Sequence, residues 1–165
     1  MNVERIAEVV EGFAAEQTLD TVLAANENAR VCLTNSFQAE DMAVLHILRQ
    51  RIPEVPVLFL DTGYHFAQTY EYRDRMAKEW SLRLVNVLPK QTVPEQESAF
   101  GILYHSDPTR CCQLRKVEPL MRALEPFDVW FKEQLATLFP PEVDLSQPVP
   151  GVQQIWDWQR ATAAV

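Results

Sequence analysis

Short apolar runs alternate with longer amphipathic stretches along the central part of the chain. Three of these runs are typical of buried strands. They are ARVCLT (29–34), VPVLFL (55–60) and LRLVNVL (82–88). A helix is predicted after each of them, over 39–52, 66–80 and 92–100. Because strands and helices alternate, the pattern predicts an α/β fold with a parallel sheet and right-handed crossovers.

The two ends of this pattern add three helices and a strand. An amphipathic helix is predicted over 3–16, and a second short helix follows with Asp20 near its start. A further helix is predicted over 112–125, where Pro119 is expected to bend or split it. The stretch FDVWF (127–131) is expected to form a fourth strand.

The pattern changes after Trp130. We expect an α/β domain over 1–130, in which 1–27 form the N-terminal helices, and a divergent segment over 131–165. That segment begins with residues at helical spacing, which Pro140 and Pro141 end, and continues as a proline-rich stretch with a last short helix.

Length and charge narrow the function classes. With 165 residues and 47% hydrophobic content, the chain is expected to fold as one globular domain. The net charge of −8 argues against non-specific binding to nucleic acid or to a membrane surface. The N-terminus carries acidic residues and no long apolar stretch, so a cytoplasmic protein is expected.

In parallel sheets, ligands bind beyond the carboxyl ends of the strands, and this rule selects three loops, the third of which follows Leu88. The first loop, Thr34–Asp41, joins a predicted strand to a helix, so backbone N–H groups and Ser36 could bind an anion. The alternative is that Asn35 or Ser36 only caps the helix. In the second loop, Asp61–His65, Asp61 could accept from a ribose hydroxyl or an adenine amine, or could bond to its own backbone in a turn.

A pair of cysteines, Cys111 and Cys112, lies close to Arg115 and Lys116. Nearby cations and a helix N-terminus stabilise thiolates, so the pair is a candidate set of ligands for a soft metal or cluster. The alternative is two partly buried cysteines at the start of a helix beside a solvated basic face. The third cysteine, Cys32, lies mid-strand and is expected to be a buried apolar residue.

Three motifs occur in order: SFQAED, LDTG followed by TYE, and RCCQLRKVEPL. Together they resemble the sulfonucleotide reductases of sulfate assimilation, which reduce adenylyl sulfate or phosphoadenylyl sulfate. The resemblance covers residues 29 to 130 and is most specific in the cysteine motif. It implies a three-layer, Rossmann-like fold of the adenine nucleotide alpha hydrolase-like type.

The resemblance also implies roles for individual residues. The first loop would hold the phosphosulfate end of the substrate, the second would approach the adenosine, and Lys116 would lie between the cluster and the substrate. These substrate-binding candidates are Ser36, Phe37, Gln38, Asp41, Asp61, Thr62, Gly63, Arg115 and Lys116. Cys111 and Cys112 would supply half of a [4Fe–4S] site, and thioredoxin would be the reductant. The tandem-cysteine form is associated mainly with adenylyl sulfate.

The sequence departs from the family pattern at two places. Gln38 stands where the family usually has a glycine, and its side chain narrows the approach of an anion to the backbone. The family's second Cys-x-x-Cys pair and its nucleophilic tail cysteine do not occur in these 165 residues. We therefore expect the cluster to be incomplete or absent in this chain.

Three interpretations remain open at this point. The first is a reductase that binds nucleotide but is weak or inactive in catalysis. The second is a working reductase that uses Cys111 or Cys112 directly, or completes a cluster across a homo-oligomer. The third is a non-catalytic adenine-nucleotide-binding or interaction module. The ATP pyrophosphatases fit less well, because Phe37 and Gln38 replace the glycines of their pyrophosphate loop.

Overall fold

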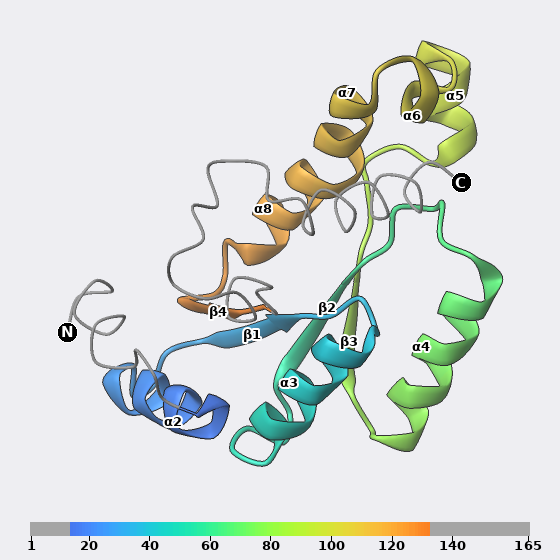
Figure 1. Cartoon of the computed structure of the whole chain (residues 1–165). Coiled ribbons are helices and arrows are strands. Elements are labelled where there is room, and N and C mark those ends of the chain that lie inside the picture. Colours follow the sequence, from blue (N-terminus) through green and yellow to red (C-terminus); the bar gives the residue numbers. More distant parts are fainter. Residues whose placement is uncertain (1–13, 133–165) are drawn as a thin grey trace, which may run out of the picture.

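The computed structural model describes residues 14–132. Its helices and strands alternate along the chain (Figure 1). In order they are α2 (Ala15–Ala25), β1 (Val31–Thr34), α3 (Ala39–Arg49), β2 (Pro56–Leu60), α4 (Ala67–Glu79), β3 (Arg83–Val87), α5 (Val93–Phe100), α6 (Leu103–Ser106), α7 (Pro108–Cys112), the π-helical turn η1 (Gln113–Val117), α8 (Glu118–Leu124) and β4 (Val129–Phe131).

The four described strands form one parallel sheet in the order β3-β2-β1-β4. Leu33 of β1 pairs with Val57 of β2 on one side and with Phe131 of β4 on the other. From β1 the chain continues to β2 and β3 on one side, and β4 pairs with β1 on the other, so the strand order reverses beside β1, and ligands bind at the carboxyl ends of strands at such a point. The helices α5, α6 and α7 lie beyond that same edge (Figure 1).

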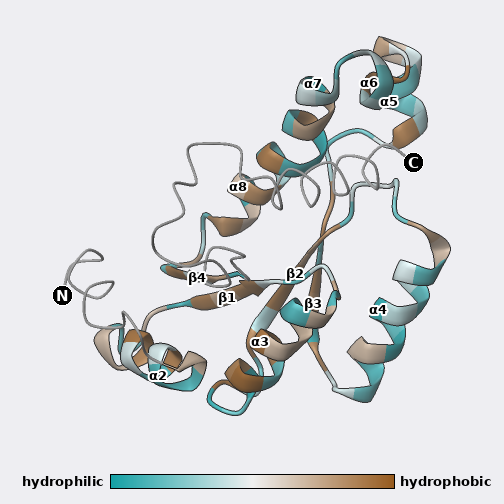
Figure 2. Cartoon of the chain, viewed as in Figure 1, coloured by the Kyte–Doolittle hydropathy of each residue, from teal (hydrophilic) through white to brown (hydrophobic). Residues whose placement is uncertain are grey.

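Helices cover both faces of the sheet, which explains why β1 and β2 are largely apolar. On one face α2, α3 and α4 pack over residues such as Leu33 and Phe59. On the other face Ala123 and Leu124 of α8 pack against Cys32, Leu58 and Val87. Figure 2 shows apolar residues along β1, β2 and α3. The predicted α/β fold with helices on both sides of a parallel sheet is confirmed.

The fourth strand, β4, is held beside β1 by an ion pair that precedes it. The Asp128 carboxylate accepts from the backbone N–H of Arg30 at 2.9 Å and from its guanidinium at 2.8 and 3.0 Å. The backbone N–H of Asp128 donates in turn to the Arg30 carbonyl at 2.8 Å. These bonds fix the register of β4 and lower the pKa of Asp128 well below its usual range.

Two helix boundaries differ from the prediction. Helix α2 begins at Ala15, so Asp20 lies in its middle, where its carboxylate accepts from Arg51 at 2.8 Å rather than starting the helix. The predicted helix over 112–125 begins at Pro108, because Asp107 caps it and accepts from the backbone N–H of Arg110. A proline at the first helical position after an N-cap aspartate is a common helix start. Cys111 and Cys112 therefore lie in the second turn of this helix rather than at its first residue.

Pro119 does not end the long helix. The five residues before Glu118 form the π-helical turn η1, and α8 continues from it without a break. Proline lacks an N–H and its ring presses against the preceding turn, so a widened turn relieves the clash. The expected distortion is therefore a local π-helical turn just before Pro119.

Several predictions lie outside the described residues. They are the helix over 3–16, apart from its last residues, and the helix, proline-rich stretch and final helix after Phe131. Within residues 14–132, no helix is long and apolar enough to cross a membrane.

Candidate functional site

The first site loop follows β1 and is organised by its own side chains. The Asn35 side chain accepts from the backbone N–H of Phe37 at 2.6 Å and donates to the Asp41 carbonyl at 3.0 Å. The Asp41 carboxylate accepts from the backbone N–H of Ser36 at 2.6 Å and from its hydroxyl at 2.5 Å. In this arrangement Asp41 uses the two donors of Ser36 that the anion-site prediction assigned to a ligand.

The loop places Phe37 in a left-handed conformation, with φ of 65°. This conformation is uncommon for a bulky residue, and it is held by the Asn35 bond and by edge contacts with Phe59 and Tyr72. Gln38 has an ordinary extended backbone and is the N-cap of α3, but no side chain caps this helix. The alternative that Asn35 or Ser36 caps α3 is therefore wrong, and the first N–H groups of α3 have no side-chain acceptor in the described residues.

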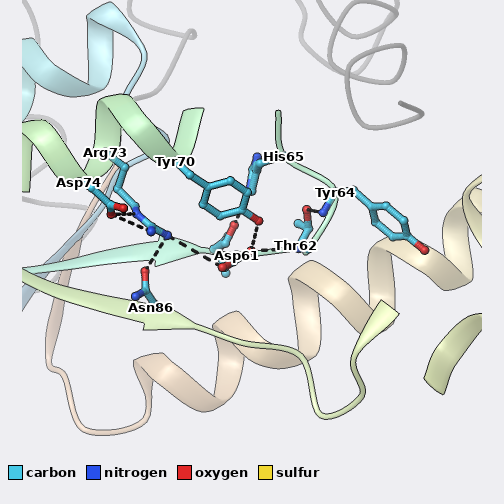
Figure 3. Close-up of polar contacts among 10 residues, drawn as sticks. Asp61, Thr62, Tyr64, His65, Tyr70, Arg73, Asp74 and Asn86 are labelled. Carbon is cyan, nitrogen blue, oxygen red and sulfur yellow. Dashed lines mark hydrogen bonds and ion pairs between the residues drawn. The ribbon is translucent and has the colours of Figure 1, made fainter. Parts of the chain in front are cut away.

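The second site loop follows β2 and is anchored through Asp61 (Figure 3). One carboxylate oxygen of Asp61 accepts from the Tyr70 hydroxyl at 2.6 Å and from the backbone N–H of Gly63 at 3.0 Å. The other lies 3.9 Å from the Arg73 guanidinium. The turn to its own backbone, one of the two alternatives for Asp61, is thus present, together with two side-chain partners.

Tyr70 and Arg73 extend this network from α4 toward the sheet. The Arg73 guanidinium lies over the rings of Phe59 and Tyr70, at 5.0 and 4.9 Å, and donates to the Asn86 side chain at 3.2 Å. Burial, and then the bond to Asp61, raise the pKa of Tyr70 to about 12. The hydroxyl of Tyr70 therefore stays protonated and acts as a fixed donor to Asp61.

His65 has a structural position. Its Nε2 is 2.8 Å from the Leu60 carbonyl, and its ring packs against Phe59 and Tyr70. Figure 3 shows His65 beside Tyr70. Because a carbonyl only accepts, Nε2 carries the proton in this contact. His65 thus closes the turn that carries the second site loop.

Arg115 links the second site loop to the helix that carries Cys111 and Cys112. This helix, formed by α7, η1 and α8, is called the cysteine helix below. Its side chain is 3% exposed, and its Nε donates to the Thr62 carbonyl at 2.5 Å. Its guanidinium also donates to the Gln91 carbonyl at 3.3 Å and to the Gln96 side chain at 3.0 Å, and it lies 5.2 Å from the centre of the Tyr64 ring. Arg115, a predicted substrate-binding residue, is therefore buried, and its hydrogen bonds connect its helix to three segments: the second site loop, the loop after β3 and α5.

Gly63 leaves the space that the Arg115 guanidinium occupies when it makes these hydrogen bonds. Its φ is +76°, and a Cβ at this position would lie 2.8 Å from the Val93 side chain and 3.0 Å from the Arg115 guanidinium. Only glycine adopts this conformation without strain, and only glycine leaves room for the guanidinium.

The two adjacent cysteines differ in environment. Cys111 is buried and Cys112 is exposed. Burial raises the pKa of Cys111, while a contact with the Gln96 side chain and the charge of Arg115 act in the opposite direction. The next residue after Arg115, Lys116, is partly exposed and makes no ion pair within the described part of the chain.

The residues present supply two of the four thiolates that a [4Fe–4S] cluster requires. No group of three or more potential metal ligands occurs in the part of the chain that the structure describes. A buried thiol beside an amide and a guanidinium suits a thiolate ligand, since both groups donate hydrogen bonds. Cys111 therefore has the surroundings of a thiolate ligand, whereas Cys112 is exposed and no further ligand lies beside the pair in the described residues.

A small pocket of about 170 Å³ lies between the loop after β3 and the cysteine helix. It is lined by Pro89, Lys90, Gln91, Gln96, Leu114 and Glu118. Lys90 and Glu118 form an ion pair at this pocket. The pocket thus places a buried amide, that of Gln96, next to the helix that carries Cys111.

A family model of the phosphoadenosine phosphosulfate reductase domain matches residues 30–133. This match covers more than half of the chain and includes both site loops and the cysteine motif. The chain belongs to the phosphoadenosine phosphosulfate reductase domain family. The predicted resemblance is thereby confirmed.

Curated relatives of this family include adenosine 5'-phosphosulfate reductases from Chelativorans sp. (strain BNC1), 42% identical over 102 residues, and Streptomyces coelicolor, 41% identical over 102 residues. Each alignment covers 61% of this chain and 42% of the relative. The chain thus spans about two fifths of the length of these relatives.

A solved structure shows the same fold. The phosphoadenylyl-sulfate reductase of Candida auris, crystallised as a phosphate complex, matches with a TM-score of 0.68 at 20% identity. The match covers 98% of this chain and 88% of that chain.

Sequence reasoning missed several residues that shape the family site. Tyr70 and Arg73 were assigned to a helix but not to the Asp61 network, although their spacing places them on one face of α4. Gln96 and Tyr64 were not singled out at all, and Tyr64 donates to Glu97 at 3.0 Å. Nothing in the local sequence marks Gln96, because its role depends on contacts with Arg115, 19 residues away.

Proposed function

We propose that this chain is the sulfonucleotide-binding part of an adenylyl-sulfate reductase. The contact that carries the proposal is the bond from Arg115 to the Thr62 carbonyl. It joins two family motifs that lie 53 residues apart in the sequence, at the sheet edge where nucleotides bind. The family match over residues 30–133 supports the same assignment.

By resemblance, the substrate lies across the carboxyl ends of β1 and β2. The loop that contains Ser36, Phe37, Gln38 and Asp41 would face the phosphosulfate end, where the first N–H groups of α3 suit an anion. The turn formed by Asp61, Thr62 and Gly63 would face the adenosine. Lys116, which makes no ion pair with a described residue, is the cation proposed to meet the sulfate.

Adenylyl sulfate is the proposed substrate, rather than its 3′-phosphorylated form. The curated relatives reported above, 41–42% identical in sequence, are named adenosine 5'-phosphosulfate reductases. The tandem cysteines Cys111 and Cys112 point in the same direction by resemblance. The products would be sulfite and AMP, which places the reaction in sulfate assimilation and cysteine biosynthesis.

The proposed reaction transfers two electrons. A thiolate attacks the sulfur of adenylyl sulfate, an S–S bond forms, and the bond from that sulfur to the phosphate oxygen breaks, which releases AMP. A dithiol such as reduced thioredoxin then supplies two electrons, releases sulfite and becomes a disulfide. This scheme requires an accessible nucleophilic cysteine.

The chain's own cysteines meet this requirement unequally. Cys32 is 0% exposed, and burial raises its pKa to about 11, so it does not serve as the nucleophile. Cys111 is buried and Cys112 is exposed. Since these 165 residues contain no cysteine after Cys112, we propose that they bind the sulfonucleotide and that turnover by them alone is slow or absent.

Cys111 and Cys112 are the proposed ligands for half of a [4Fe–4S] cluster. When bound, a cluster held by four thiolates would carry a net negative charge, which the neighbouring cations Arg115 and Lys116 would offset. A second copy of the chain could provide two further thiolates, which makes a homo-oligomer part of the proposal. Free thiols, with no disulfide among the three cysteines, favour the reducing cytoplasm as the location.

Isothermal titration calorimetry of the chain with adenylyl sulfate and with AMP tests the proposal. Saturable binding of both ligands is expected, with adenylyl sulfate the tighter one. No heat of binding for either ligand would contradict the assignment of the nucleotide site. A parallel assay of sulfite release with reduced thioredoxin measures turnover separately.

A further inference from the structure

The side chain of Gln96 is fixed in one orientation inside the protein. It is 1% exposed, and its Oε1 accepts from the Arg115 guanidinium at 3.0 Å. A guanidinium only donates, so the oxygen of the amide must face Arg115. The amide nitrogen, Nε2, therefore faces away from Arg115 with two N–H groups to donate.

Nε2 has no conventional acceptor. Among the buried side-chain nitrogen and oxygen atoms of residues 14–132, it alone lacks a hydrogen-bond partner. Such an atom is rare in a folded protein, and it calls for an explanation, which can be a ligand.

The buried side chain of Cys111 belongs to the same helix as Arg115, which contacts this amide. Cys111 is one helical turn before Arg115, so both side chains leave the helix on the same side, toward Gln96. A neutral thiol is a weak acceptor, whereas a thiolate is a strong one. The unpaired donor thus matches an anionic sulfur at Cys111.

We propose that Gln96 is a positioning residue that donates an N–H···S hydrogen bond to Cys111 when this cysteine is a metal-bound thiolate. Arg115 holds the amide in the required orientation, and the same guanidinium is bonded to Thr62 in the nucleotide loop. Groups that hydrogen-bond to metal ligands orient them and strengthen metal binding. The inference rests on the proposed role of Cys111 as a metal ligand.

Cadmium binding to the full chain tests this role, followed through the thiolate-to-metal charge-transfer absorbance under anaerobic conditions. Gln96→Glu keeps an oxygen for Arg115 but replaces the donor, and Gln96→Met removes both functions without adding charge. Both variants should bind Cd²⁺ at least about 10-fold more weakly than the wild type. Removing a residue that hydrogen-bonds to a metal ligand typically weakens metal binding by this much or more. Gln91→Glu is the matched control for charge, because Gln91 lines the same pocket, and it should stay within about 2-fold of the wild type.

Cys111→Ser separates the possible failures. If it leaves Cd²⁺ binding unchanged, or if the wild type binds no Cd²⁺, the ligand role and the inference fall together. If it abolishes binding while both Gln96 variants bind like the wild type, only the inference about Gln96 is overturned. Calorimetry with adenylyl sulfate on the same samples reports on the nucleotide site independently.

A measurement on the unmutated chain tests the proposal even if the variants fail to fold. In protein labelled with ¹⁵N-glutamine, the side-chain N–H resonance of Gln96 should move downfield when Cd²⁺ binds, as expected for a new bond to a thiolate. The resonance of Gln91 serves as the internal reference. A Gln96 resonance that does not move while Cd²⁺ occupies the site overturns the proposal.

Discussion

Replacing Arg115 with methionine would remove the tie between the nucleotide loop and the cysteine helix. Methionine has a similar length and can fill the buried space, but it cannot donate a hydrogen bond. The carbonyl of Thr62 and the Oε1 of Gln96 would lose the donor that satisfies them. The Gln91 carbonyl would lose a longer contact at 3.3 Å.

The cost follows from the burial of those acceptors. Thr62 and Gln96 are both buried, so water does not easily replace the missing donor. An unsatisfied buried acceptor costs about 1–3 kcal/mol, so we expect Arg115→Met to lower the free energy of unfolding by about 2–6 kcal/mol. Arg115→Lys should recover only part of this loss, because an ammonium cannot reproduce the planar fork that reaches two loops.

Urea unfolding followed by circular dichroism measures the loss. Arg122→Met is the matched control: Arg122 lies on the same helical rod and also donates to a backbone carbonyl, that of Leu88, but its side chain is exposed. The control should lose less than about 1 kcal/mol. A stability of Arg115→Met equal to that of the control would refute the view of Arg115 as a buried structural tie.

Three further predictions concern single residues. Gly63→Ala should destabilise the chain by about 1–3 kcal/mol in urea unfolding, because of its φ of +76° and the close approach of Val93; a change near zero would show that the turn relaxes freely. Burial raises the pKa of Cys32 to about 11, so stability should fall as the pH rises from about 9 to 11, where the unfolded thiol ionises and the folded one does not. Cys32→Ala should flatten that dependence, and an identical slope in both proteins would contradict it. The pKa of Asp128 is lowered by Arg30, so its contribution is present above about pH 4 and is lost as the pH falls further; melting curves of Asp128→Asn should show a weaker acid dependence than those of the wild type.

Much of the fold follows from the sequence because local and tertiary preferences agree. The runs that became β1 and β2 are largely apolar, as strands covered on both faces must be, whereas β3 at the end of the sheet order also carries Arg83 and Asn86. The helix after Thr92 was also predicted closely, because Thr92 and Glu95 form a capping box with Pro94 in the first turn. In these segments the local sequence preferences and the tertiary packing favour the same secondary structure.

The parts that were not predicted depend on contacts between distant residues. The sequence placed Arg115 and Asp61 near the substrate, but their partners come from other loops: Thr62 and Gln96 for Arg115, and Tyr70 for Asp61. No local pattern distinguishes a basic residue that is exposed to a ligand from one that is buried among carbonyls.

The helix start at Pro108 was predicted wrongly for a different reason. Asp107 and Pro108 do form a local signal, but hydrophobic periodicity begins only later in the helix. Capping residues were therefore the better guide to the boundary, and they place both cysteines inside the helix.

The central claim is that the two loops and the cysteine helix form one sulfonucleotide site with Lys116 beside the sulfate. Calorimetric comparison of adenylyl sulfate and AMP binding to the wild type and to Lys116→Ala tests it most directly. We predict that the substitution weakens adenylyl sulfate binding by about 10-fold, corresponding to about 1.4 kcal/mol, and changes AMP binding much less. Equal losses for the two ligands, or no loss for either, would contradict it.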